Sequence, residues 1–525
     1  MKINKKILYF LFLFLLLLFI KVDFRIINQL QCCQDDFDYY SHALTIVQDF
    51  DFDYSNQFDS KKRFYDNGKI APRGFVGSGL FSTPFLFIGN LADRFIENNQ
   101  NILDYKKLFY SFSSIFYLFF SYFLIALTLK GKLSEKLLLF SYFGSGLSYF
   151  AFERYSMTHV YEVFTIALVI FFSEKYYSQK KRLNIFSILI PLSILSSFLV
   201  RWTNYYVVLI PFIIFKLSFH NKNVKQRLLK DKLFFVTSLI SLGIFALMSK
   251  LIYGVVTFDP TYIYGAEKIR EGVQNNIIQN LYNFLVDFFM DTLNTLFTFE
   301  FGLFWFSPII FLGFLLTIFD FFNSKTNLKF VYFVILIAFA QCFAVISIWN
   351  STGASYGFRY LYSLIPLCFY IISKSLSFEK YKIFKNYLLY FSIFSTFSIL
   401  FFETTIGTQL SLEEVVNSFG ELKKFSQPNY LIGYIEAIGI KESYLKIFAT
   451  SMLGAFTFKI FIVIFDKDYL FTLLSNFGLS SNNEDFISLV DKLVLIEINK
   501  FVTVLIFCIA ISLFYFKKVS GHSKL

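Results

Sequence analysis

The sequence predicts an all-α protein that crosses a membrane many times. Of its 525 residues, 56% are hydrophobic and 22% are aromatic, whereas only 16% are charged. The mean hydropathy is +0.56. A soluble domain carries about 25% charged residues. Helices are the expected elements because a membrane-spanning helix satisfies its backbone hydrogen bonds within one segment. The composition therefore excludes an ordinary soluble domain.

The first apolar run follows a short basic start. MKINKK precedes ILYFLFLFLLLLFI, and no small-x-small cleavage site comes after it. We therefore expect an uncleaved first span with a cytoplasmic N-terminus, which makes residues 21–107 the first outer loop. Within that loop, Gly77 to Phe95 is apolar but interrupted by Gly and Pro. This pattern predicts a helix that lies in the membrane interface.

Further apolar runs follow along the chain, and each is a candidate span. They occupy about 108–129, 137–152, 160–173, 183–200, 205–219, 233–253, 303–323, 330–349, 360–376 and 387–402. A span needs roughly 20 residues. Several runs are shorter, so the pairs within 137–173 and 183–219 are expected to form hairpins that only just cross.

The loops between these runs alternate in charge. KGKLSEK, KLSFHNKNVKQRLLKDK and KSLSFEKYKIFK are basic and fall on the side of the N-terminus. The opposite loops carry FERYSMTHVYE, the long segment 254–302 and WNSTGASYGFR. Basic residues favour the cytoplasmic side of a membrane. The net charge of +12 is thus explained by membrane orientation, and we expect no nucleic-acid partner.

The pattern weakens after Phe402. We divide the chain into a transmembrane core, 1–402, and a C-terminal outer region, 403–525. The outer region contains one apolar segment, 445–465, and a last span, 499–516. The total is about twelve spans if 445–465 lies on the membrane surface, and about thirteen if that segment crosses.

The segment QDDFDYYSHALTIVQDFDFDYSNQF begins at Gln34 and is rich in aspartate. Carboxylates at this density cannot enter hydrocarbon, so they must lie in water beside the bilayer. Asp35 stands at a predicted helix start, which the helix dipole favours. The aspartates either keep the loop hydrated or provide a general base that removes a proton from an attacking hydroxyl group.

Two arginines are predicted at the outer ends of spans. Arg201 follows the run 183–200, and Arg359 lies in a Gly-rich loop before the run 360–376. Each is either a helix anchor whose head group reaches water or a guanidinium group that binds a phosphate through two hydrogen bonds. Lys268 and Arg270, in the long outer loop, are secondary phosphate candidates or simply solvated.

The acidic segment carries a resemblance to a known family. D-D-F-D-Y-Y-S-H-A, followed by QDFDFDYSN, resembles the D-E-x-x-Y-x-x-x-A first-loop motif of bacterial GT-C-type membrane glycosyltransferases, the relatives of the aminoarabinose and protein O-mannosyl transferases. Asp35 falls on the catalytic acidic position of that motif. Asp36 falls on the Glu, Tyr39 on the Tyr and Ala43 on the Ala.

Other stretches are similar to segments of the same family, and they occur in the family's order over about residues 30–370. They are GSGLFSTP, MTHVYEVF, RWTN, FGLFWFSP and GASYGFRYL. Thr158 replaces a Ser of the family pattern, and Trp202 replaces a Pro. The resemblance does not extend to 403–525.

The resemblance implies a GT-C-like fold and an enzyme of the bacterial cytoplasmic membrane with its active site on the outer face. Such an enzyme moves a sugar from a polyprenyl-phosphate donor to a hydroxyl group of a lipid, glycan or protein acceptor. A single base in a direct displacement implies inversion at the anomeric carbon. The expected catalytic residues are Asp35, Asp36 and Glu153; Arg359, Arg201, Lys268 and Arg270 would bind the donor phosphate, and Tyr39, His159, Asn204, Tyr262 and Tyr356 the rest of the substrates.

Two alternatives stay open. Asp35, Asp36, Glu153 and His159 could hold a divalent cation, but the sequence requires none and we assign no metal ligand. The pattern around His159 favours a core histidine with a hydrogen bond near the interface over a ligand or an acid/base group. The second alternative is a transporter or flippase of lipid-linked saccharides. Coupled transporters carry ionisable groups in mid-span, whereas here the carboxylates gather in outer loops, which favours the enzyme.

Overall fold

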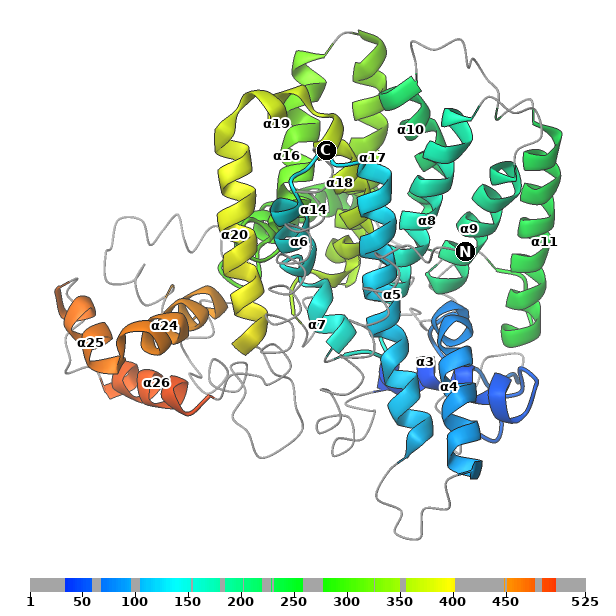
Figure 1. Cartoon of the computed structure of the whole chain (residues 1–525), viewed down its shortest axis with the longest axis horizontal. Helices are drawn as coiled ribbons and strands as arrows, with labels where there is room; N and C mark the ends of the chain where they lie inside the picture. The colour runs from blue at the N-terminus through cyan, green and yellow to red at the C-terminus, as the bar shows by residue number, and fades with distance from the viewer. Residues whose placement is uncertain are drawn as a thin grey trace, which may run out of the picture.

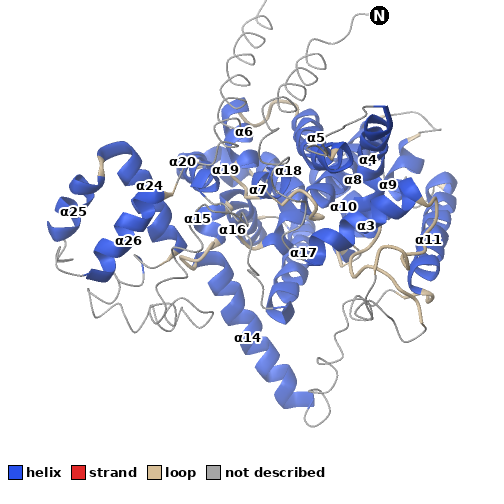
Figure 2. Cartoon of the chain, turned by 90° about the horizontal axis from the view of Figure 1, so that it is seen from below, coloured by secondary structure: helices blue, strands red, loops and turns tan. Residues whose placement is uncertain are grey.

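The computed structural model describes residues 34–58, 68–95, 104–152, 154–179, 185–201, 203–219, 228, 231–257, 277–324, 326–349, 356–401, 448, 451–476 and 484–496. Every regular element in these ranges is helical, comprising nineteen α-helices and two short 3₁₀-helices (Figures 1 and 2). The predicted all-α class is confirmed for the described residues. The predicted first span and the predicted last span, 499–516, lie outside them.

The first half of the chain forms α3 (Gln34–Gln48), α4 (Gly77–Phe95), α5 (Tyr105–Leu129), α6 (Glu135–Phe143), α7 (Leu147–Phe152), α8 (His159–Ser178), α9 (Phe186–Val200), η2 (Tyr205–Leu209), α10 (Ile210–Phe219) and α11 (Lys232–Tyr253). The second half forms α14 (Ile277–Phe297), α15 (Leu303–Phe306), α16 (Pro308–Asn323), α17 (Thr326–Trp349), η3 (Arg359–Leu364), α18 (Ile365–Lys374), α19 (Leu376–Lys380), α20 (Lys382–Phe401), α24 (Met452–Phe465), α25 (Lys467–Asn476) and α26 (Glu484–Leu495).

Three of the described helices are long and apolar enough to cross a membrane. They are α5, α11 and the segment Leu328–Ile348 of α17. Local sequence sets the ends of two of them. Asp104 caps α5 by accepting a hydrogen bond from the amide of Lys107, and Asp231 caps α11 in the same way. Such caps satisfy amides that have no partner inside a helix. The total of about twelve spans stays a prediction.

Several predicted runs are divided into shorter helices. The run 137–152 separates into α6 and α7 where Gly146 adopts a φ of +89°. The run 303–323 separates into α15 and α16, with Pro308 at the first position of α16. Pro is well suited to that position because its missing N–H has no partner there in any helix.

The helix predicted for residues 77–95 forms as the single helix α4, with Pro84 inside it. It packs beside α5 and α3. Gly79 permits the close approach of α3, because a Cβ atom there would lie 2.9 Å from the backbone nitrogen of Ala43. The Gly residues that interrupt the apolar pattern therefore serve helix packing.

Helices α5, α8 and α18 run in the same direction through the centre of the bundle (Figure 1). The hydroxyl groups of Ser113 and Tyr161 are 2.6 Å apart near the starts of α5 and α8. At the other ends, Tyr370 of α18 donates a 2.8 Å hydrogen bond to Glu174 of α8. This parallel arrangement gives the bundle two ends with different residues.

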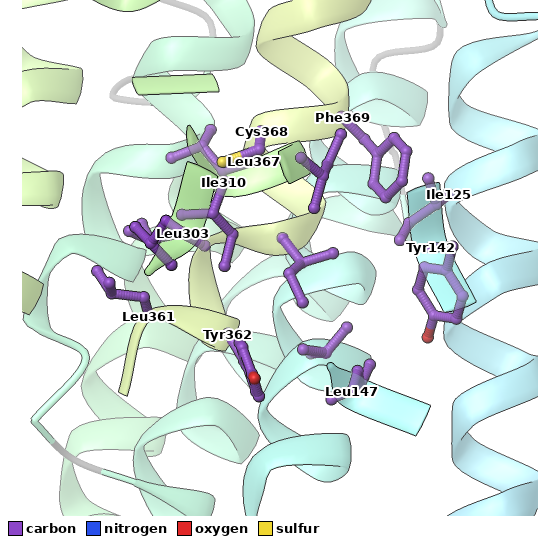
Figure 3. Packing of buried hydrophobic residues seen from close by; sticks show 14 of the residues in the cluster. Ile125, Tyr142, Leu147, Leu303, Ile310, Leu361, Tyr362, Leu367, Cys368 and Phe369 are labelled. Carbon is purple, nitrogen blue, oxygen red and sulfur yellow. The ribbon is translucent and has the colours of Figure 1, made fainter. Parts of the chain in front are cut away.

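The core between these helices is apolar, with a few internally bonded hydroxyl groups. Leu303, Ile310, Leu367 and Phe369 are among its buried residues (Figure 3). Tyr142 lies in the same core and donates a hydrogen bond of 2.9 Å to the carbonyl of Leu118. A buried hydroxyl group without such a partner would be costly.

The described part of the C-terminal region contains α24, α25 and α26. The 14 residues of α24 extend about 21 Å, less than the roughly 30 Å of a bilayer core. Lys459, inside α24, donates a 2.7 Å hydrogen bond to the carbonyl of Leu493 near the end of α26. A cation is favoured at a helix C-terminus, so this contact joins the two helices.

Candidate functional site

The site is built around Glu162, which lies in the first turn of α8 and is 1% exposed. Asn204 donates a 2.7 Å hydrogen bond to Oε1 of this carboxylate. Oε2 is 3.3 Å from Nη1 of Arg201 and 3.0 Å from Nδ1 of His159. Because a carboxylate only accepts, the His159 proton lies on Nδ1. A buried carboxylate thus has a cation and two further donors around it, which offsets its loss of hydration.

Arg201 and Asn204 reach Glu162 because of the turn that follows α9. Arg201 is the residue at which α9 ends. The turn is held by Gln341 of α17, whose side-chain oxygen accepts a 3.0 Å hydrogen bond from the amide of Tyr206 and whose nitrogen donates to the carbonyl of Thr203. A polar side chain inside an apolar helix therefore fixes the segment that supplies two partners of the carboxylate.

A second guanidinium group, that of Arg359, lies next to the first. The Tyr360 ring centroid is 4.9 Å from Cζ of Arg201 and 5.4 Å from Cζ of Arg359. Nε of Arg359 is buried and has no hydrogen-bond partner among the described residues. Gly357, just before η3, adopts a φ of +72°, and a Cβ atom there would collide with the Tyr362 hydroxyl group. This turn directs the chain into Arg359.

The two adjacent aspartates at the start of α3 differ in their surroundings. Asp35 is partly exposed, whereas Asp36 is buried and lies 3.3 Å from Nη2 of Arg154, which is also buried. The pair connects α3 to the segment that leads into α8. Glu153, the third residue expected in the catalytic group, lies outside the described residues.

His42, on α3, ties the segment that follows α3 to α11. Its Nδ1 accepts a 2.6 Å hydrogen bond from the Tyr54 hydroxyl group. Its Nε2 is 2.8 Å from the carbonyl oxygen of Gly74, which also accepts from Tyr253. The carbonyl can only accept, so Nε2 carries the proton. Burial lowers the pKa of His42 to about 4, partly offset by the bond to Gly74; His42 is therefore neutral at pH 7.

The loop after α3 is ordered by its own aspartates. Asp53 accepts a 3.0 Å hydrogen bond from the amide of Ser55, and this bond lowers the pKa of Asp53. Asp49 accepts from the side chains of Asn56 and Gln57, at 3.0 and 2.7 Å. These carboxylates hold turns of the loop.

Apart from Asp35 and Asp36, the predicted site residues fall into three groups. Arg201, Asn204, His159 and Arg359 are brought together around Glu162 and Tyr360. Tyr39 and Tyr356 are buried in the core. The Tyr356 hydroxyl group is 3.2 Å from that of Ser395. The residues that lie outside the described ranges are Glu153, Tyr262, Lys268 and Arg270.

Sequence analysis missed Glu162, although it lies in a segment that carries the resemblance. His159 and Glu162 are three residues apart, so a helix places them next to each other. That spacing would have been enough to predict the contact between His159 and Glu162 from the sequence. The pairing of Asp36 with Arg154 had no such signal, since these residues are far apart in the chain and nothing local links them.

Comparison of the chain with protein-family models, with curated proteins and with solved structures finds no match.

The charges around Glu162 indicate which ligands this site suits. Glu162 pairs with Arg201, whereas Arg359 lies beside the same Tyr360 ring without a carboxylate partner in the described structure, so positive charge is in excess near the start of α8. The N-terminus of a helix adds a partial positive charge. An anion that offers several oxygens, such as a phosphate, matches this arrangement. Across the described residues, no group of three or more His, Cys, Asp and Glu side chains is placed to hold a metal ion.

Proposed function

We propose that this chain is a membrane glycosyltransferase that moves a sugar from a polyprenyl-phosphate donor to a hydroxyl acceptor at the outer face of a bacterial cytoplasmic membrane. The proposal includes a bundle of about twelve spans. The observation that carries it is the pair of guanidinium groups on Tyr360, of which Glu162 neutralises only one.

The donor phosphate would bind at Arg359. Glu162 engages Arg201 at 3.3 Å, whereas Nε of Arg359 is buried without a hydrogen-bond partner in the described structure. A phosphate leaving group gains negative charge as its bond to the sugar breaks, and a preorganised cation stabilises that charge. Arg201, held by Glu162 and stacked on Tyr360, would position the ring between the two guanidinium groups.

The proton of the acceptor hydroxyl group would pass to Asp35. Asp35 is the more open of the two leading aspartates, because Asp36 forms the buried pair with Arg154. As the acceptor oxygen bonds to the anomeric carbon, the bond from that carbon to the phosphate oxygen breaks and the polyprenyl phosphate leaves. One displacement inverts the anomeric configuration, and NMR of the product linkage tests this directly.

Asp35→Asn separates this enzyme from a transporter of lipid-linked saccharides. The variant removes the base and keeps the shape, so we expect loss of glycan transfer with normal folding and normal retention of the lipid-linked substrate. The measurement is mass spectrometry of cell-envelope glycans from cells that carry the wild type, Asp35→Asn or no copy of the chain.

Asp51→Asn is the matched control, because Asp51 lies in the same acidic segment and is exposed. We expect it to leave the glycans unchanged. If Asp35→Asn cells produce normal glycans, the proposed base is wrong. If the glycans are unchanged even when the chain is absent, the transferase function itself is refuted.

A further inference from the structure

The far end of α8 carries a second charged cluster that the proposed transfer does not use. Glu174 lies in the last turns of α8, twelve positions after Glu162. The two carboxylates are therefore about 18 Å apart along the helix. Glu174 is buried although it lies near the end of the bundle. The side chains that surround Glu174 therefore lie at the other end of α8 from the site that contains Arg359.

Both oxygens of Glu174 already have partners. Tyr370 of α18 donates a 2.8 Å hydrogen bond to Oε2, and Nζ of Lys130 is 3.5 Å from Oε1. The Tyr370 hydroxyl group is also bonded to that of Ser218. Glu174 is thus held by partners from α18 and from the residue that follows α5, and it can neutralise only part of the positive charge near it.

Lys374, at the end of α18, lies near the same carboxylate and near two other lysines. The main electrostatic neighbours of Lys374 are Glu174, Lys132 and Lys130. Nζ of Lys374 is 4.9 Å from the centre of the Tyr370 ring, whose hydroxyl group bonds to Glu174, and Lys374 is half-buried. Ammonium groups that share one carboxylate repel one another, and the cluster keeps a net positive charge.

The position of the cluster at the end of a candidate membrane-spanning helix indicates its ligand. Lys130 directly follows α5, one of the three helices long and apolar enough to cross a membrane. The end of such a helix lies at the level of the lipid head groups. One turn earlier, Leu127 is 41% exposed and offers an apolar surface for an acyl chain.

We propose that Lys130, Lys132 and Lys374 form a binding site for the phosphate group of an anionic membrane lipid. Basic clusters at helix ends on the cytoplasmic side are known to attract anionic head groups. The positive-inside rule alone accounts for basic loops, but it does not require lysines from the end of α5 and the end of α18 to lie close to one buried carboxylate and its tyrosine partner. The proposal is independent of the transferase function.

The test uses the purified full-length chain in detergent micelles. Native mass spectrometry and thermal unfolding are followed while phosphatidylglycerol or phosphatidylcholine is titrated in. We expect the wild type to retain phosphatidylglycerol preferentially and to unfold at a higher temperature with it. Lys132→Gln/Lys374→Gln should bind it roughly 30-fold more weakly, since each lysine near a membrane surface contributes about a fivefold factor.

Two further variants keep the test decisive. Lys380→Gln/Lys382→Gln removes the same charge from exposed positions near the same end of the bundle and should bind like the wild type. Glu174→Gln removes the competing carboxylate and should bind phosphatidylglycerol more tightly. Equal losses in the two double variants would overturn the site, because general surface charge would then explain binding. Equal stabilisation by inorganic phosphate would overturn the assignment to a lipid.

Discussion

Glu162 and Glu174 lie at the two ends of α8 and meet different kinds of cation. Glu162 contacts Arg201, Asn204 and His159, and all of these side chains have little exposure to solvent. Glu174 faces Lys130, whose side chain is 57% exposed. A guanidinium group is planar and presents its donors in a fixed fork, whereas an ammonium group is a hydrated point charge on a flexible stem.

The two ends of α8 therefore differ in how firmly the structure positions their cations. At the Glu162 end, a turn held by Gln341 and the ring of Tyr360 fix the cations in space. At the Glu174 end, the cations come from a loop and from the last residue of α18. The first end suits a reaction that needs precise orientation, and the second suits attraction of a mobile head group.

The largest expected effect on stability is at the Glu162 end. Glu162→Ala leaves Arg201 without its carboxylate, and breaking a buried ion pair in this way costs about 3–5 kcal/mol of unfolding free energy. Denaturant unfolding in micelles measures this. Glu162→Gln should cost less, because its amide oxygen still accepts from Asn204. A loss below about 1 kcal/mol for Glu162→Ala would show that this end is no more tightly held than the other.

The next largest expected effect is a dependence of stability on pH, which comes from His42 on α3. The pKa of His42 is about 4 in the fold and 6.5 as a free side chain. The fold therefore gains stability from keeping His42 neutral. This contribution to the free energy of unfolding is complete above pH 6.5, and it falls by an amount on the order of 3 kcal/mol as the pH is lowered toward 4. Unfolding measured across this window checks the prediction. His42→Asn should remove this part of the slope, and an unchanged slope would contradict it.

An exchange of cation type sharpens the comparison further. Under the proposed transferase function, Arg359→Lys keeps the charge but loses the fork, which costs one charge-assisted hydrogen bond of about 1.5–3 kcal/mol, or roughly 10–100-fold in the rate of glycan formation. Lys132→Arg should leave phosphatidylglycerol retention within about threefold, because a head group tolerates either cation. Tolerance of Arg359→Lys would remove the distinction between the two ends.

The smallest expected effect is that of Glu174→Gln on stability. The amide still accepts from Tyr370, and the ion pair with the exposed Lys130 is worth at most about 1 kcal/mol. The same unfolding assay measures it beside Glu162→Gln. A larger loss for Glu174→Gln than for Glu162→Gln would reverse the order of the two ends.

Much of the helical framework could be predicted from local sequence. The apolar runs became helices, including α4 with its internal Pro84, because helix formation and apolar periodicity depend on neighbours in the chain. The points at which these runs divide were harder to predict. The helices α6 and α7 separate at Gly146, which has a positive φ and lies against the hydroxyl group of Tyr362, a residue distant in the chain.

By itself, the sequence determined the all-α class of the described residues, their apolar runs, the acidic first segment and the positions of Arg201 and Arg359 in the chain. Only the tertiary structure decided that Asp36 is buried with Arg154 while Asp35 stays partly open, that Glu162 pairs with Arg201, and that Tyr360 lies beside both arginines. The physical reason is distance along the chain: Arg201 and Asn204 are 39 and 42 residues from Glu162. Periodicity gives each helix a buried face, but the partner of a buried charge depends on how the helices pack together.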